Sequence, residues 1–123
     1  MKISNFFVVK AVICFIFGLG SLLIPTIMWP IYGVSLDPNG LLMARFLAAL
    51  LIGVGLILWI YRNEDPGKLK EITFSLFIAD TIGFIVAFVG QLSGVMNSLG
   101  WIVVAIWLFL ALGLGYFRFL KTS

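Results

Sequence analysis

Four long apolar stretches dominate this chain of 123 residues, and they cover residues 6–28, 41–61, 72–92 and 99–120. A helix needs about 20 mostly apolar residues to cross the hydrocarbon core of a bilayer. Each of the four stretches meets that length. The sequence therefore predicts an all-α integral membrane bundle of four transmembrane helices, formed as a single domain over residues 1–123.

The composition excludes several other classes of protein. Hydrophobic residues make up 63% of the chain and charged residues 11%, whereas soluble domains have roughly 45–50% and about 25%. Such apolar content excludes disorder, and a single cysteine excludes an intrachain disulfide scaffold. With no histidine and only Cys14, the usual zinc, haem and Ser-His-Asp sites lack their side chains. We therefore expect no metal, no cofactor and no catalytic residue.

The segments between the apolar stretches contain proline, glycine and most of the charge. Asp37 precedes Pro38, and Asp65 precedes Pro66. An aspartate followed by proline is typical of a helix start, with the aspartate as N-cap. These pairs predict the starts of the second and third helices, and Asn97 or Ser98 is the expected cap of the fourth.

The basic residues predict the orientation of the bundle. With four spans in up-down order, seven of the eight basic residues fall on one side of the membrane: Lys2, Lys10, Arg62, Lys68, Lys70, Arg118 and Lys121. Cytoplasmic loops carry an excess of lysine and arginine. The sequence thus predicts an N-in/C-in protein of a prokaryotic inner or plasma membrane. The net charge of +3 is attributed to this topology and to lipid contact, not to nucleic acid, and Lys10 is expected to extend to the cytoplasmic surface.

Small residues predict where the helices pack against one another. Association in lipid depends on close packing and polar contacts, and small residues let helix backbones approach. A stripe at four-residue spacing lies in the third span, and a Gly-x-Gly lies in each of the others. Two glycines two residues apart point to different faces, so each pair is expected to contact two neighbours. The candidates are Ser75, Ala79, Gly83, Ala87, Gly18, Gly20, Gly53, Gly55, Gly113 and Gly115.

Two ionisable residues, Arg45 and Asp80, fall clearly inside the apolar stretches. Charge within the membrane is costly, about 2.5–3.5 kcal/mol per residue on insertion scales. Measured from the span midpoints, Arg45 lies about 12 Å from the depth of Asp80 but only about 4–5 Å from that of Gln91. We therefore predict a polar seam of Arg45, Gln91 and Asp80. In one interpretation the seam is structural: the Arg45 side chain extends to the outer surface of the membrane, and Asp80 is protonated or hydrogen-bonded within the bundle. In the other, the seam lines a cavity that binds a ligand or a proton.

The chain resembles the small four-helix bacterial membrane proteins grouped loosely with the DoxX-like families. The resemblance rests on a glycine-rich first helix ending at Pro25, on Tyr32-Gly33-Val34, on Arg45 within LLMARFLAALLIGVGLILW, and on a short basic loop. It implies a compact four-helix bundle with Arg45 as the family-like polar position. Most members are uncharacterised, so the resemblance implies no activity.

The expected function is non-enzymatic. A chain of this size with short loops and small-residue faces indicates an accessory subunit of a membrane complex or a homo-oligomer, with lipids and other membrane subunits as partners. The alternative is a small transporter or binder of a lipophilic or polar ligand at Arg45, Asp80 and Gln91, with or without proton coupling. An enzyme acting on lipids or quinones is disfavoured, because histidine, paired carboxylates and CxxC are all missing.

Overall fold

The computed structural model describes residues 2–121, and within this range it contains helices and no strand. The elements are α1 (Ile3–Leu23), α2 (Pro25–Ile31), α3 (Pro38–Tyr61), α4 (Lys70–Leu92), α5 (Gly100–Gly115) and the π-helical turn η1 (Tyr116–Leu120). Four helical segments are long and apolar enough to cross a membrane: α1, α3, α4, and α5 continued through η1. The prediction of an all-helical chain with four such segments is confirmed.

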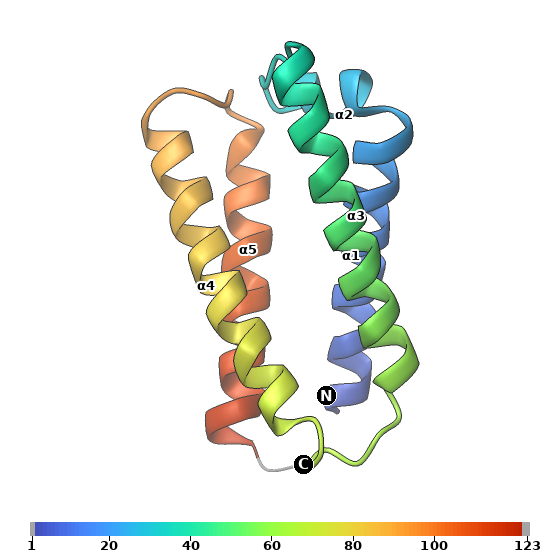
Figure 1. Cartoon of the computed structure of the whole chain (residues 1–123). Helices are drawn as coiled ribbons and strands as arrows, with labels where there is room; N and C mark the ends of the chain where they lie inside the picture. Colours follow the sequence, from blue (N-terminus) through green and yellow to red (C-terminus); the bar gives the residue numbers. More distant parts are fainter. Residues whose placement is uncertain (1, 122–123) are drawn as a thin grey trace.

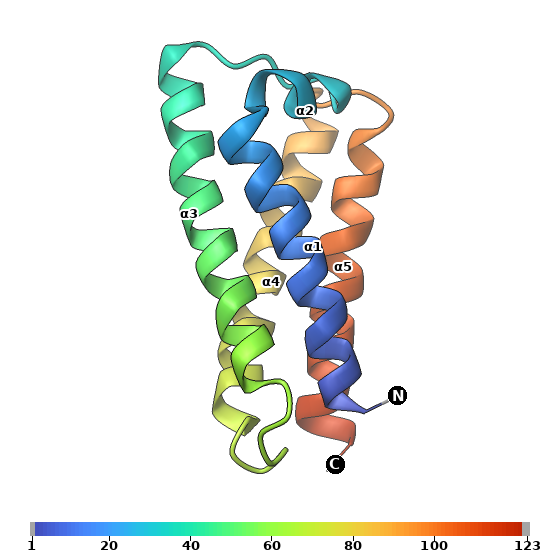
Figure 2. The ribbon, with the colours of Figure 1, turned by 90° about the vertical axis from the view of Figure 1, so that its right-hand side faces the viewer.

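The long helices form two hairpins, α1–α3 and α4–α5, and the closest backbone approaches lie within these pairs (Figure 1). Seen from the side, α1 lies in front of α4, with α3 and α5 to either side (Figure 2). The start of α1, the η1 turn and the α3–α4 loop lie at one end of the bundle, which we call the terminal end. The α2 segment and the α4–α5 loop lie at the opposite end, which we call the α2 end.

The first apolar stretch is divided by Pro25. The helix predicted over residues 6–28 ends at Leu23, where Ile24 leaves helical geometry with φ −135° and ψ 48°. Proline lacks the N–H that would continue the helical hydrogen bonds, and its ring clashes with the preceding turn. The chain therefore restarts as the seven-residue helix α2, and the prediction of a single helix to residue 28 is wrong.

One of the two Asp-Pro signals marks a helix start. Asp37 caps α3, because its carboxylate accepts a hydrogen bond from the Gly40 N–H at 2.6 Å. Asp65 does not cap α4, which begins only at Lys70. Its carboxylate accepts from the Gly67 N–H two residues on, at 3.3 Å, which is the hydrogen bond of an Asx turn. The predicted cap at Asp65 is therefore wrong, since the same residue pair also starts tight turns.

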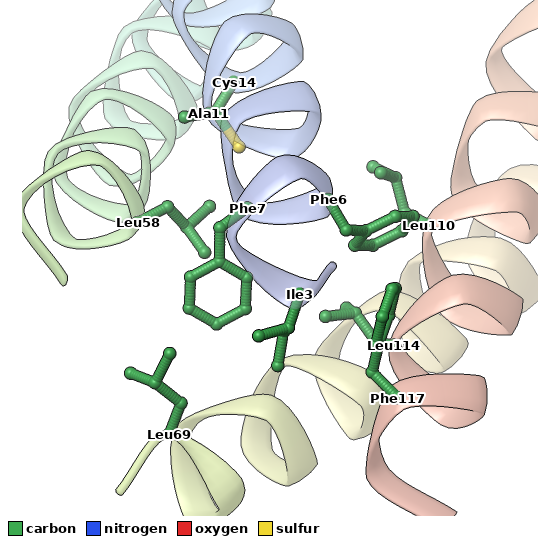
Figure 3. Close-up of a cluster of buried hydrophobic side chains, with 10 residues drawn as sticks. All are labelled: Ile3, Phe6, Phe7, Ala11, Cys14, Leu58, Leu69, Leu110, Leu114 and Phe117. Atoms are coloured by element: carbon green, nitrogen blue, oxygen red, sulfur yellow. The ribbon is translucent and has the colours of Figure 1, made fainter. Parts of the chain in front are cut away.

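The main core joins the two hairpins at the terminal end. It consists of buried apolar side chains from α1, α3, α5, η1 and the α3–α4 loop (Figure 3), and partly buried side chains of α4 pack against it. Its members are Ile3, Phe6, Phe7, Ala11, Cys14, Leu58, Leu69, Leu110, Leu114 and Phe117. Because these side chains are bulky, they fill the space between hairpins whose backbones do not approach closely.

At the α2 end, the hairpins are joined by hydrogen bonds from one asparagine. The Asn97 side-chain amide donates to the Ile31 carbonyl, and its backbone N–H donates to the Tyr32 carbonyl, both at 2.9 Å. Its side-chain oxygen accepts from the Leu99 N–H at 2.9 Å, so Asn97 also closes the turn before α5. Gly33 adopts a φ of +84°, and a Cβ there would lie 2.6 Å from the Asn97 nitrogen. Only glycine fits that approach without strain.

Candidate functional site: the buried Lys10–Asp80 pair

An ion pair between α1 and α4 lies inside the bundle. The Lys10 ammonium donates to both carboxylate oxygens of Asp80, at 2.8 Å to Oδ2 and 3.0 Å to Oδ1. Lys10 is only 3% exposed and Asp80 only 2%. The two residues belong to different hairpins, so the pair connects the hairpins through the middle of the molecule.

The expectation that Lys10 extends to the membrane surface is wrong. Lys10 lies about 10 Å beyond the start of α1 at Ile3, at 1.5 Å per residue. At that depth a carboxylate on the facing helix is a closer partner than the headgroup region. Pairing each charge within the bundle removes the cost of leaving either one alone in an apolar environment.

Arg45 lies apart from this pair. The face of α3 that packs against the bundle contains Ala44 and Ala48, which are buried. Arg45 follows Ala44 directly and is therefore turned by about 100° around the helix. It is exposed, and its guanidinium makes no hydrogen bond or ion pair with any of residues 2–121.

The Gln91 side chain is hydrogen-bonded to the α4–α5 loop. Its side-chain N–H donates to the Asn97 carbonyl at 3.0 Å, and its buried Oε1 has no hydrogen-bond partner among the described residues. The structure therefore does not bring Arg45, Gln91 and Asp80 together into the predicted seam. Asp80 has Lys10 as its partner instead.

The sequence contained the signal that would have identified Lys10. Both α1 and α4 begin at the terminal end (Figure 1). Counted from there, Asp80 lies about 15 Å beyond Lys70 and Lys10 about 10 Å beyond Ile3. A gap of about 5 Å is within reach of a lysine side chain. Lys10 had been counted among the charges that flank the first span, so its similar depth to Asp80 did not enter the prediction.

A small cavity of about 60 Å³ adjoins Lys10. Apart from Lys10, the lining is apolar or aromatic and comes from α1, α2, α3 and α5: Ile13, Cys14, Phe17, Trp29, Leu47, Leu51, Val103, Ile106, Trp107 and Leu110. An ammonium has three N–H donors, and Asp80 accepts two hydrogen bonds from it. The cavity is much smaller than typical ligand pockets of about 300–1,000 Å³.

The predicted small-residue stripe of α4 is only partly an internal contact surface. Ala87 is buried, and Gly83 lies under the Trp107 ring, where a Cβ would collide with it. Ser75 and Ala79 are exposed. A step of four residues advances about 40° beyond a full turn, so such a stripe winds around a straight helix from its outer to its inner side.

The paired glycines of α5 contact two different helices. Gly113 faces the Phe6 ring of α1, and Gly115 faces the Phe77 ring of α4. The absence of a side chain at these positions leaves room for one aromatic ring from each hairpin.

In the first hairpin, three of the four paired glycines face a neighbouring side chain and one does not. A Cβ at Gly18 would lie 3.0 Å from Ile52 of α3, and Gly20 faces Met28 of α2. Gly55 faces Phe15 of α1, where a Cβ would lie 2.8 Å from the ring. Gly53 has no atom within 4 Å of the position that its Cβ would occupy.

No family model, no curated protein and no solved structure matches the chain. The resemblance to DoxX-like proteins accordingly stays a prediction, and a function for this chain is argued from its own residues.

Proposed function

We propose that this chain is a non-enzymatic protein of a prokaryotic cell membrane that acts by lateral association. It serves as an accessory subunit of a membrane complex or as a homo-oligomer. In this proposal the helices cross the membrane in up-down order with both termini in the cytoplasm. The basic residues support that orientation, because Arg62, Lys68 and Lys70 lie in or beside the α3–α4 loop and none lies in the loops of the α2 end.

The observation that carries the proposal is the outer face of α3 formed by Arg45, Ala49 and Gly53. Arg45 and Ala49 are exposed, and Gly53 has open space beside it. These residues follow one another at four-residue spacing, and each step turns about 40° around the helix. They therefore run from the flank of α3 at Arg45 to the side opposite the buried Ala44 and Ala48 at Gly53. Small residues at that spacing are the usual contact surface between membrane helices.

No contact with any of residues 2–121 accounts for a glycine at position 53. Glycine within a helix costs roughly 0.5–1 kcal/mol relative to alanine. Gly18 and Gly55, in the same hairpin, each accommodate a neighbouring side chain, whereas Gly53 accommodates none among the described residues. A helix packing onto α3 from outside would use the space that Gly53 leaves.

Arg45 places a guanidinium beside these small residues, and its N–H donors need hydrogen-bond acceptors. None of the described residues supplies one. Carboxylates and backbone carbonyls of an adjacent helix are the acceptors a protein partner offers. The partner is therefore a membrane helix that presents a small-residue face and an acceptor near the depth of Arg45.

Disulfide crosslinking in the native membrane tests this proposal. Cys14 is the only cysteine and is buried. The test is made in a Cys14→Ala variant, so that the introduced cysteine is the only thiol that can form a disulfide. Ala49→Cys is introduced on the proposed face, and Ile16→Cys serves as the control. Ile16 of α1 is 60% exposed and lies within about 8 Å of the depth of Ala49, since Phe15 and Gly18 contact α3 at Gly55 and Ile52.

We expect Ala49→Cys to form a crosslinked dimer on mild oxidation if the partner is a second copy, with little product from Ile16→Cys. If the partner is another subunit, the assembly extracted in mild detergent should fall to the mass of a single chain in Gly53→Leu. Equal crosslinking at both positions, or a wild-type chain that is extracted alone, would contradict the proposal.

The cavity beside Lys10 favours a second candidate, a binder of a small lipophilic molecule. The volume of about 60 Å³ limits the ligand to one smaller than those of typical pockets. Within that limit, the third N–H of Lys10 could donate to a carbonyl or hydroxyl oxygen. Native mass spectrometry would detect such a molecule retained by the wild type. Leu47→Trp, which fills the cavity, should abolish its retention, whereas retention by that variant would exclude this site.

A further inference from the structure

A second hollow lies at the terminal end, and its chemistry differs from that of the cavity beside Lys10. It has a volume of about 420 Å³ and lies between the α3–α4 loop, the first turn of α4 and the η1 turn. This volume is within the usual range of ligand pockets, about 300–1,000 Å³. The hollow is therefore large enough for a small ligand or a lipid headgroup.

Among residues 2–121, the charged side chains lining this hollow are all basic. They are Lys70, Arg118 and Lys121, and no acidic side chain of that range lines it. Glu64 of the α3–α4 loop pairs instead with Lys68, at 3.6 Å. The hollow thus presents positive charge from two segments far apart in the sequence.

Arg118 is held in place by aromatic rings. Its guanidinium carbon lies 5.3 Å from the Phe74 ring centroid and 5.2 Å from the Phe119 ring centroid, as in cation–π contacts. Its Nε is buried and has no hydrogen-bond partner among the described residues. Arg118 lines the hollow, and the fork of N–H donors at the end of a guanidinium suits the oxygen atoms of a phosphate.

The local backbone adds to this arrangement. Residues Tyr116–Leu120 widen into a π-helical turn, a rare geometry that occurs frequently at functional sites. On the other side of the hollow, α4 begins at Lys70. The N–H groups of its first turn have no partners within the helix, and a helix N-terminus favours anions. Two basic segments and a helix start therefore converge on one hollow.

We propose that this hollow is a binding site for a phosphate-type oxyanion, held by Arg118, Lys70 and the first turn of α4. The ligand is either the headgroup of an anionic phospholipid or free inorganic phosphate, since both present the same oxygen atoms. This site is distinct from the outer face of α3, so it does not rest on the proposed lateral association.

The test compares Arg118→Gln with Arg62→Gln. Arg62 is also an arginine at the terminal end, in the α3–α4 loop, but its guanidinium donates to the Trp59 carbonyl and lies over the Trp59 ring. It does not line the hollow. Each purified protein is mixed in neutral detergent with phosphatidylglycerol or phosphatidylcholine and examined by native mass spectrometry. A parallel calorimetric titration uses inorganic phosphate without added lipid.

We expect wild type and Arg62→Gln to retain one phosphatidylglycerol in preference to phosphatidylcholine, and Arg118→Gln to lose at least fivefold of that retention. Calorimetric binding of inorganic phosphate with the same dependence on Arg118 would instead identify the free anion as the ligand. If Arg118→Gln does not elute as a folded species, Lys70→Gln is tested instead. Lys70 is exposed, so its substitution should not disturb the fold. No preference for the anionic lipid and no phosphate binding, or equal losses in the variants of Arg118 and Arg62, would overturn the proposal.

Discussion

Lys10 and Asp80 show how two costly residues become acceptable in an apolar bundle. Each charge alone would be strongly unfavourable, but together they satisfy one another with two hydrogen bonds. Removing one partner of a buried pair leaves an uncompensated charge, whereas replacing both by apolar residues is often neutral. The pair is therefore sensitive to single substitutions and tolerant of a matched double substitution.

We expect Lys10→Met alone to destabilise the bundle by about 3–5 kcal/mol, because Asp80 is left buried without its partner. The double variant Lys10→Met/Asp80→Leu should recover most of this loss. Denaturation in mixed micelles followed by circular dichroism measures both. Lys68→Met is the control, because the Lys68–Glu64 pair is exposed and such pairs contribute about 0–1 kcal/mol. A double variant less stable than either single variant would show that the pair itself stabilises the fold.

Two glycines near the middle of their helices predict opposite effects of the same substitution. A methyl group at Gly83 would collide with the Trp107 ring, whereas one at Gly53 would meet nothing within 4 Å. We expect Gly83→Ala to destabilise the isolated chain by about 1–3 kcal/mol. Gly53→Ala should stabilise it by about 0.5–1 kcal/mol through helix propensity. Unfolding of the single chain in detergent measures both changes, and a loss of stability in Gly53→Ala would contradict the open space described beside it.

Helix starts differ in how tightly they are defined. Asp37 accepts the Gly40 N–H and caps α3, while Asp65 closes a turn that ends before α4 begins. The same Asp-Pro pair thus has two structural outcomes. The position of the next glycine distinguishes them: Gly67 stands directly after Pro66, and Gly40 comes two residues after Pro38.

Asp37→Ala should therefore destabilise the start of α3 by about 1 kcal/mol, since an N-cap side chain is lost. Hydrogen exchange of the amides at residues 40–42 should become several times faster. Asp65→Ala is the matched comparison and should leave the exchange of residues 70–76 unchanged. Faster exchange at the start of α4 in Asp65→Ala would mean that Asp65 does support that helix.

The sequence was sufficient to predict the helical class, the number of membrane-length segments and the Asp37 cap, because these depend on local composition. The apolar pattern predicted a span to residue 28 and so ran past the end of α1 at Leu23, although Pro25 was the signal for an earlier end. The partner of Asp80 depends on helix rotation and relative depth, which are set by packing and not by any single segment. Arg45 illustrates the same limit. Ala44, one residue earlier on α3, is buried, whereas Arg45 is exposed.

The molecule as a whole is two hairpins joined at three levels. Large side chains join them at the terminal end, the Lys10–Asp80 pair joins them within the bundle, and Asn97 joins them at the α2 end. Within each hairpin, by contrast, small residues allow the helix backbones to approach closely. This difference in packing suggests that each hairpin is a unit and that the contact between hairpins is more easily altered.

Dividing the chain within the α3–α4 loop, between Glu64 and Asp65, tests this organisation. We expect the two co-expressed halves to associate in the membrane and to be purified together through a tag on one of them. Asp80→Asn in the second half should reduce recovery of the first several-fold, because Lys10 then lacks its counter-charge. Exchanging the charges, with Lys10→Asp in one half and Asp80→Lys in the other, should restore much of the recovery, whereas Lys10→Asp alone should not. If the halves associate equally well in every variant, the apolar core at the terminal end is sufficient to join the hairpins, and the buried pair has another role.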